Sequence, residues 1–76
     1  MEIKDFIQNL VTVFDDVEVE DLTPETNYHD IEEWSSIVAL SVIAMIDEEY
    51  NVILSGDDIK NASTVQDLFD IVSKKK

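Results

Sequence analysis

The chain has 76 residues, a length that fits one domain and leaves no room for a deeply walled active site beside its core. It has no cysteine, so neither disulfides nor a thiolate metal site can supplement that core. Eighteen acidic residues against five lysines give a formal net charge of −13, which disfavours nucleic acid and anionic membranes as partners and favours basic proteins. An apolar content of 45% argues against disorder.

No segment is expected to direct the chain into or across a membrane. The first ten residues mix charged and apolar side chains and lack the apolar stretch of a signal peptide. The longest apolar stretch, residues 37–46 interrupted only by Ser41, is too short to span a bilayer. We therefore expect a cytoplasmic protein with one domain over residues 1–76.

In chain order, the first expected element is a helix within residues 2–14. Its apolar residues recur at helical spacing and would form a stripe that faces the core: Ile3, Phe6, Ile7, Leu10, Val11 and Phe14. Asp15 and Asp16 would be unfavourable at a helix C-terminus, so the helix is expected to end near them.

A connection of about twenty residues follows, over residues 15–35. Its apolar residues keep no sustained period, and we expect them to anchor the loop onto the helices: Val17, Val19, Leu22, Tyr28 and Ile31. Thr23 and Pro24 are of the types that begin helices, which predicts one helical turn there. Connections this long are commonly functional or mobile.

The central helix is expected over residues 36–50. Ser35 is a suitable N-cap, and Asn51 tolerates the left-handed conformation that often ends a helix. The helix is apolar nearly all round until the acidic run 47–49, a pattern that predicts packing against neighbours on most sides.

Two more helices are expected near the C-terminus. Residues 55–58 have cap spacing and begin a brief helix through Lys60. Ser63 and Gln66 match the capping box of a last helix over residues 64–74, which would bury Val65, Leu68, Phe69 and Val72. Lysines 74–76 lie at its end, where positive charge is favourable. With one proline and one glycine for turns, the sequence predicts an all-α fold of three longer helices and one short helix.

Catalytic and metal-binding constellations are not expected. His29 has no cysteine or second histidine to complete a zinc site, and the acidic pairs lack the ligand spacing of a calcium loop. A single glycine, Gly56, forms no phosphate-binding loop. A lone histidine in a loop, with no basic residue nearby, does not favour a catalytic triad. We therefore expect that the chain is not an enzyme.

Two hydroxyl groups, on Ser35 and Ser36, lie at the start of the central helix. An exposed serine at a helix N-terminus suits a phosphodiester, because the first-turn amides and the helix dipole both favour an anion. Serines in this position are more often simple caps, so local physics alone leaves both roles open.

Four stretches, in order and at matching spacing, resemble the acyl carrier protein family. Residues 30–37, DIEEWSSI, are similar to the family's approach to its Asp-Ser-Leu signature, and residues 46–52, IDEEYNV, are similar to the end of its second helix. Residues 62–68, ASTVQDL, resemble the entry into its final helix, and residues 22–26, LTPET, fit its first loop. The resemblance covers almost the whole chain and implies a four-helix bundle of acyl-carrier type with a long first loop.

The resemblance implies that Ser36 receives 4′-phosphopantetheine from coenzyme A, transferred by a phosphopantetheinyl transferase. An acyl group would then travel as a thioester on this arm between loading and transferring enzymes, as in fatty acid biosynthesis and other lipid metabolism. These enzymes would present basic or mixed basic and apolar patches to a monomeric carrier. Four apolar residues either line a cleft for the acyl chain or form plain core: Leu40, Ile43, Ile46 and Ile59.

Two features depart from the family pattern beside the expected attachment site. The family's aspartate before the serine is Ser35 here, and the register of the motif assigns the arm to Ser36. Where fatty-acid carriers bear acidic residues early in the second helix, this chain has Val38 and Ser41. We therefore expect a specialised carrier with a dedicated partner. The residues expected to contact that partner are Ser35, Ile37, Val38, Ser41, Met45, Asp47 and Glu48.

Two alternatives stay open. An aminoacyl or peptidyl carrier would have the same fold and the same attachment serine, because the loading enzyme chooses the cargo. A helical interaction module that has lost the prosthetic group is favoured by the departures at Ser35 and Val38.

Overall fold

Four α-helices joined by loops make up the part of the chain that the structure describes. The computed structural model describes residues 2–76. Its helices are α1 (Ile3–Val11), α2 (Ser36–Tyr50), α3 (Gly56–Asn61) and α4 (Val65–Lys75), with two short 3₁₀ helices in the first connection, η1 (Val19–Asp21) and η2 (Tyr28–Asp30). The expected all-α fold, with three longer helices, one short helix and a long first loop, is confirmed. No helix in residues 2–76 combines the length and apolar content needed to cross a bilayer.

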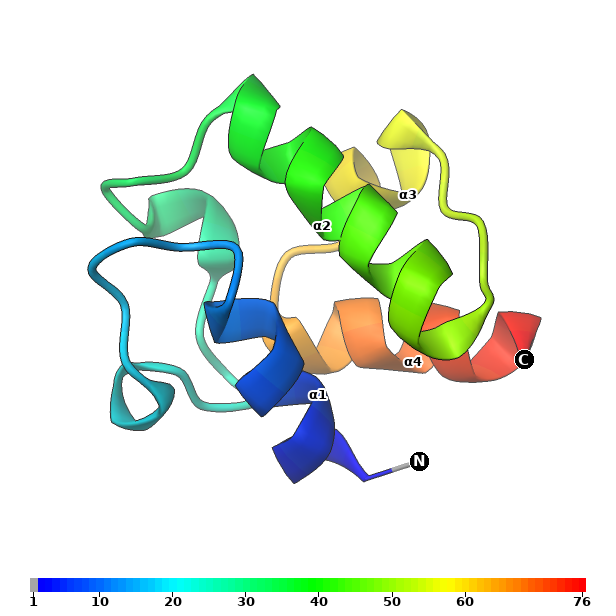
Figure 1. Cartoon of the computed structure of the whole chain (residues 1–76), viewed down its shortest axis with the longest axis horizontal. Helices are drawn as coiled ribbons and strands as arrows, with labels where there is room; N and C mark the ends of the chain where they lie inside the picture. The colour runs from blue at the N-terminus through cyan, green and yellow to red at the C-terminus, as the bar shows by residue number, and fades with distance from the viewer. Residues whose placement is uncertain (1) are drawn as a thin grey trace.

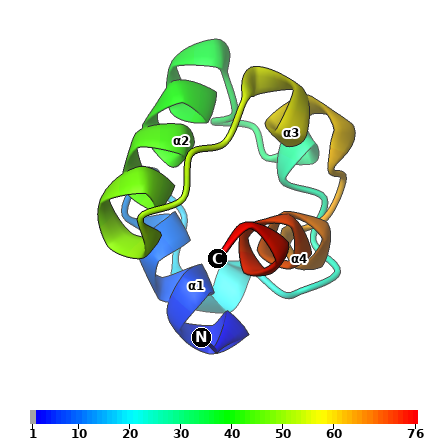
Figure 2. The same cartoon turned by 90° about the vertical axis from the view of Figure 1, so that its right-hand side faces the viewer.

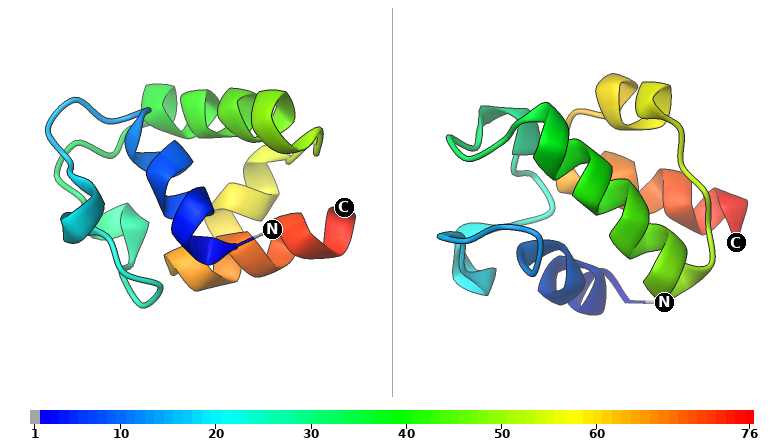
Figure 3. Two further views of the ribbon diagram at one scale, coloured as in Figure 1. Left: turned by 60° about the horizontal axis from the view of Figure 1, so that its bottom comes forward. Right: turned by 45° about the horizontal axis from the view of Figure 1, so that its top comes forward.

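The helices surround a common interior. The longest helix, α2, runs diagonally across the molecule, and α4 lies below it in the same view (Figure 1). Seen from the side, α2 and α4 occupy opposite sides, with α1 and α3 on the two flanks between them (Figure 2). Further views keep this arrangement, with the first connection gathered at one end of the molecule (Figure 3). The short helix α3 therefore forms one side of the molecule, next to α2.

Phe6 on α1 is the centre of the core. It is fully buried, lies edge-on to Phe69 of α4 at 5.4 Å between ring centroids, and contacts Tyr50 of α2 at 5.8 Å. The apolar stripes expected on α1 and α4 face this core, with Phe69 itself half-buried. One aromatic ring thus joins the three longer helices.

The helix α1 ends earlier than the sequence indicated. It stops at Val11, and the next turn tightens: the Val13 N–H donates to the Leu10 carbonyl at 3.2 Å, and the Phe14 N–H donates to the Val11 carbonyl at 3.1 Å. This turn places Phe14 in the core. The acidic pair at residues 15–16 then lies beyond the helix, away from its unfavourable end.

The first connection is anchored at Leu22 and Tyr28, which are both buried, as expected. The prediction that Val19 anchors the loop is wrong, because its side chain is 40% exposed in the single turn of η1. The helical turn expected from Thr23 is also wrong. The Thr26 N–H donates to the Thr23 carbonyl at 3.1 Å in an isolated turn, and the helical turn forms later, in η2.

The N-cap of α4 lies one residue later than predicted, at Thr64. Its hydroxyl accepts from the Asp67 N–H at 3.1 Å, and the Asp67 carboxylate accepts from the N–H groups of Ser63 and Thr64. The backbone N–H of Gln66, the predicted partner of Ser63, donates to the Pro24 carbonyl at 2.9 Å. The first connection lies across the start of α4, and its carbonyls accept hydrogen bonds from first-turn amides that the local sequence pattern pairs with the N-cap.

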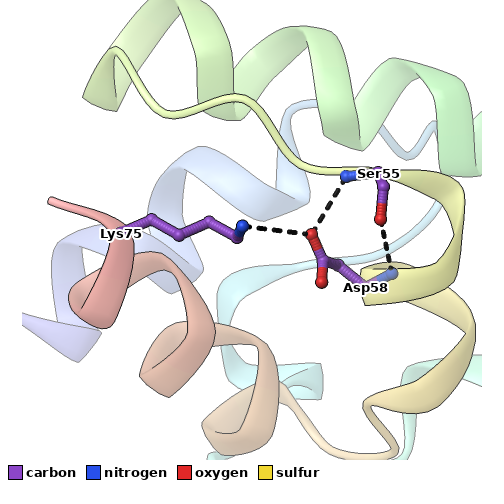
Figure 4. Close-up of polar contacts among 3 residues, drawn as sticks. All are labelled: Ser55, Asp58 and Lys75. Atoms are coloured by element: carbon purple, nitrogen blue, oxygen red, sulfur yellow. Dashed lines mark hydrogen bonds and ion pairs between the residues drawn. The ribbon is translucent and has the colours of Figure 1, made fainter.

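A capping box begins α3, as the spacing of residues 55–58 predicted. The Ser55 hydroxyl accepts from the Asp58 N–H at 3.1 Å, and the Asp58 carboxylate accepts from the Ser55 N–H at 3.0 Å. Figure 4 shows that the same carboxylate also faces Lys75 of α4, at 3.7 Å. These hydrogen bonds, chiefly the one from the Ser55 backbone, lower the pKa of Asp58. Lys75 thus links the end of α4 to α3, in addition to complementing its own helix dipole.

Candidate functional site

Ser35 is the N-cap of α2, as predicted. Its backbone is extended, its hydroxyl accepts from the Val38 N–H at 3.2 Å, and its carbonyl accepts from the Ala39 N–H at 2.9 Å. The far end of α2 also follows the prediction, because Asn51 takes the left-handed conformation with φ of 57°. The capping task at the start of the helix therefore belongs to Ser35.

Ser36 is the first residue of α2 and is exposed. No hydrogen bond joins its hydroxyl to another residue of the described chain, 2–76. The amides of Ser36 and Ile37 lie in the first turn, where a helix offers them no carbonyl partner. An anion attached to the Ser36 hydroxyl would sit beside these amides and the positive end of the helix dipole.

Aromatic packing fixes the segment that leads into α2. Trp34 contacts Tyr28 at 4.9 Å, His29 at 5.6 Å and Phe14 at 6.3 Å between ring centroids. Trp34 is only half-buried, yet it touches both η2 and the turn after α1. The residues just before Ser36 are thus held in place by side chains from η2 and from the turn after α1.

The 3₁₀ helix η2 also holds the C-terminal end of α3. The Tyr28 hydroxyl donates to the Ile59 carbonyl at 2.5 Å and lies 3.1 Å from the Ala62 carbonyl, and His29 Nε2 donates to the Ala62 carbonyl at 2.8 Å. Burial, with a smaller contribution from the charge of Asp67, raises the pKa of the Tyr28 phenol to about 12. Tyr28 therefore remains a neutral donor at physiological pH, and α3 stays attached to the segment before the serines.

Glu33 connects the same segment to the end of α1. Its carboxylate accepts from the N–H groups of Asp15 at 2.6 Å and Asp16 at 3.0 Å. Two hydrogen bonds to one carboxylate satisfy the amides of the turn after α1, and they restrain the loop two residues before Ser35.

A cleft of about 480 Å³ opens between α2 and α3, with Ser36 on its wall. The apolar part of its lining comes from both helices, and the polar part lies near the start of α2 and on α3. The lining residues are His29, Trp34, Ser35, Ser36, Ala39, Leu40, Ile43, Gly56, Ile59 and Lys60. Of the residues expected at such a cleft, Leu40, Ile43 and Ile59 line it, whereas Ile46 is fully buried in the core.

The prediction that α2 packs against neighbours on most sides is wrong. Ile37 is 76% exposed and Leu40 is 67% exposed, while the buried residues of the helix are Val42, Met45 and Ile46. The other helices lie on the inner side of α2 (Figure 2). The outer side of α2 is therefore exposed, and it is apolar in its first turns because it carries Ile37 and Leu40. An all-round apolar helix here combines a core face with an exposed apolar face.

The residues expected to contact a partner fall into two groups. Those that are exposed are Ser35, Ile37, Ser41, Asp47 and Glu48. Val38 is half-buried, and Met45 is only 9% exposed because it packs into the core, so Met45 offers little surface to a partner. Two residues beside the serines that sequence reasoning did not assign to the site are His29 and Lys60, which the packing of η2 and α3 brings to the cleft.

Comparison with known families finds a match over most of the chain. A family model described as the phosphopantetheine attachment site matches residues 5–72, a range that extends from α1 into α4. A comparison with curated proteins finds no match. Domains of this family carry a covalently attached 4′-phosphopantetheine, are not catalytic themselves, and work with phosphopantetheinyl transferases and acyl-handling enzymes. The chain belongs to the family of phosphopantetheine-binding carrier domains.

Proposed function

We propose that Ser36 is the attachment site of the 4′-phosphopantetheine arm. The observation that carries this proposal is the division of tasks between two adjacent serines. Ser35 uses its hydroxyl to cap α2, whereas the exposed Ser36 hydroxyl is not engaged by another residue of the described chain. Ser36 also lies on the wall of the cleft, so an arm attached there starts beside it.

The residues around Ser36 fit such a group. The first-turn amides and the dipole of α2 favour the phosphodiester charge, and the α2 wall of the cleft beyond the serines is apolar. When bound, the arm supplies the thiol on which cargo travels as a thioester. The chain itself supplies the serine oxygen, the amides and the surface that partner enzymes contact.

Acyl groups are the proposed cargo. Ala39, Leu40, Ile43 and Ile59 give the cleft between α2 and α3 its apolar lining. Each methylene that an acyl chain buries there would gain about 0.8 kcal/mol. A polar aminoacyl group would gain little from the same walls, so the lining favours acyl over aminoacyl cargo.

The proposed partner is a dedicated acyl-handling enzyme. The solvent-facing surface of α2 presents Ile37 and Leu40 near the attachment serine and the carboxylates of Asp47 and Glu48 at the far end. An apolar patch bordered by basic residues would complement this surface. The early turns of α2 carry no acidic side chain. A partner that binds carriers through basic residues alone would therefore have no carboxylate to pair with there.

Intact mass spectrometry tests the attachment site. We expect the wild type to gain one phosphopantetheinyl group when it is incubated with coenzyme A, magnesium and a broad-specificity phosphopantetheinyl transferase. The matched variants are Ser36→Ala, which should gain nothing, and Ser35→Ala, which should still be modified because it loses only a helix cap. The reverse pattern would move the site to Ser35. No gain by the wild type would instead favour an interaction module that has lost the prosthetic group.

A further inference from the structure

One cationic side chain, that of Lys60, lines the cleft on the wall opposite Ser36. The other lysines are Lys4 on α1 and the run 74–76 at the end of the chain, and none of them lines it. In a chain with a formal net charge of −13, a lysine at this place is the feature of the cleft that an apolar cargo does not explain.

Lys60 is available to bind an anion. It is exposed. Among residues 2–76, Lys75 forms an ion pair with Asp58, whereas Lys60 forms none. Lys75 therefore engages the acidic side chain two residues from Lys60. The Lys60 ammonium stands on a flexible four-carbon stem beside the cleft that this residue lines, and no carboxylate of the described residues lies within 4.0 Å of it.

The wall that carries Lys60 is attached to the segment that leads to Ser36. The carbonyls of Ile59 and Ala62, on either side of Lys60 in the sequence, accept hydrogen bonds from Tyr28 and His29 of η2. The two rings of η2 pack against Trp34, two residues before Ser36. A continuous series of contacts thus connects the Lys60 backbone to the segment that leads to the serine.

We propose that Lys60 is a positioning residue that pairs with the phosphodiester of the arm across the mouth of the cleft. This inference rests on the proposed attachment at Ser36. The phosphate is the one charge of the arm that is fixed next to the serine, and the surrounding acidic chain repels it, so the nearest cation attracts it over a short range. Pairing with Lys60 directs the first part of the arm across the cleft toward α3 and away from free solvent.

Phosphorus NMR of the modified protein tests this pairing. The variants are Lys60→Met, which removes the charge from the cleft, and Lys4→Met, which removes the same charge from exposed α1 as a matched control. Spectra are compared at low salt and at 1 M NaCl, where the screening length is about 3 Å. We expect the wild-type phosphodiester resonance to shift between the two salt concentrations. Lys4→Met should keep this shift, and Lys60→Met should lose it.

The possible outcomes separate this inference from the proposed function. Intact mass is measured first, and a wild type without the phosphopantetheinyl gain overturns both proposals. A modified Lys60→Met whose resonance keeps the wild-type salt shift overturns the pairing alone and leaves Ser36 as the attachment site. Thermal unfolding checks that the variant is folded, and Lys60→Gln repeats the comparison if Lys60→Met is less stable than the wild type.

Discussion

Tyr28 connects the first connection to α3 through one buried side chain. Its hydroxyl donates to a carbonyl of α3, its ring packs against Trp34, and it belongs to the first connection. Because the phenol is buried and bonded to carbonyls, it is held in its neutral form. The behaviour of this residue at alkaline pH therefore reports on the contact between η2 and α3.

We predict that Tyr28→Phe lowers the free energy of unfolding by about 1–3 kcal/mol at pH 8, because it leaves buried carbonyls without a donor. The difference from the wild type should shrink at alkaline pH. The pKa of Tyr28 rises from 10.0 to about 12 on folding, so its stabilising effect is complete below pH 10 and is lost as the pH rises toward 12.

Urea unfolding of both proteins at pH 8 and pH 11.5 measures this effect. Both proteins have the same other side chains, so the comparison isolates the Tyr28 phenol. A difference in the free energy of unfolding that stays constant between the two pH values would contradict the account of Tyr28.

At the scale of elements, the long first connection is held to the helices by polar contacts as well as by apolar anchors. Glu33 restrains the turn after α1, and the carbonyls of Pro24 and Thr26 accept from the first-turn amides of α4. The loop thus completes the ends of two helices. Its conformation is fixed by those ends and positions Trp34 and the two serines.

We predict that Glu33→Ala destabilises the protein by about 1 kcal/mol, the typical net contribution of one or two partly exposed hydrogen bonds. The matched control is Glu32→Ala, which removes an exposed neighbouring carboxylate. Hydrogen exchange should quicken at the amides of Asp15 and Asp16 in Glu33→Ala and not in the control. Equal exchange at these amides in both variants would show that the Glu33 contact does not restrain the turn.

The sequence predicted the elements that local chemistry determines. Helical spacing and cap residues placed all four α-helices within a few residues, including the Ser35 cap and the left-handed Asn51. Local patterns failed where a distant segment competes for the same groups. The N-cap of α4 is Thr64 and not the predicted Ser63. At the start of this helix, carbonyls of the first connection accept hydrogen bonds from the amides of Val65 and Gln66.

The surface of α2 shows a second limit of sequence reasoning. Ile37 and Leu40 have the same side-chain chemistry as the buried Val42 and Ile46, so the apolar pattern alone predicted that the helix is packed against neighbours on most sides. Their exposure follows from the placement of the other helices on one side of α2. Tertiary packing also places Lys60 at the cleft, because η2 holds α3 beside α2. The role of Ser36 as an attachment site is predicted only by the resemblance to acyl carrier proteins, because its local chemistry also fits a simple helix cap.

At the scale of the whole molecule, like charge opposes folding. A formal net charge of −13 on a chain with a radius of gyration of 11.0 Å places many carboxylates close together. Salt screens such repulsion, so we predict that moving from about 0.01 M to 0.5 M NaCl raises the midpoint of thermal unfolding. A gain of 1 kcal/mol corresponds to about 4–8 °C for a domain of this size.

Thermal unfolding over a NaCl series measures this effect. Magnesium chloride at equal ionic strength is the companion series, since additional stabilisation by magnesium would indicate more than screening. A midpoint that does not respond to either salt would show that the acidic side chains are already well dispersed or individually paired.

The central claim is that Ser36 carries the arm, and localising the modification within the wild-type chain tests it most directly. After modification by a phosphopantetheinyl transferase and proteolysis, fragmentation of the peptide that contains Trp34, Ser35 and Ser36 separates the two serines by mass. We expect that fragments ending at Ser35 are unmodified and that those including Ser36 carry the phosphopantetheinyl group. A modified fragment that ends at Ser35 would contradict it.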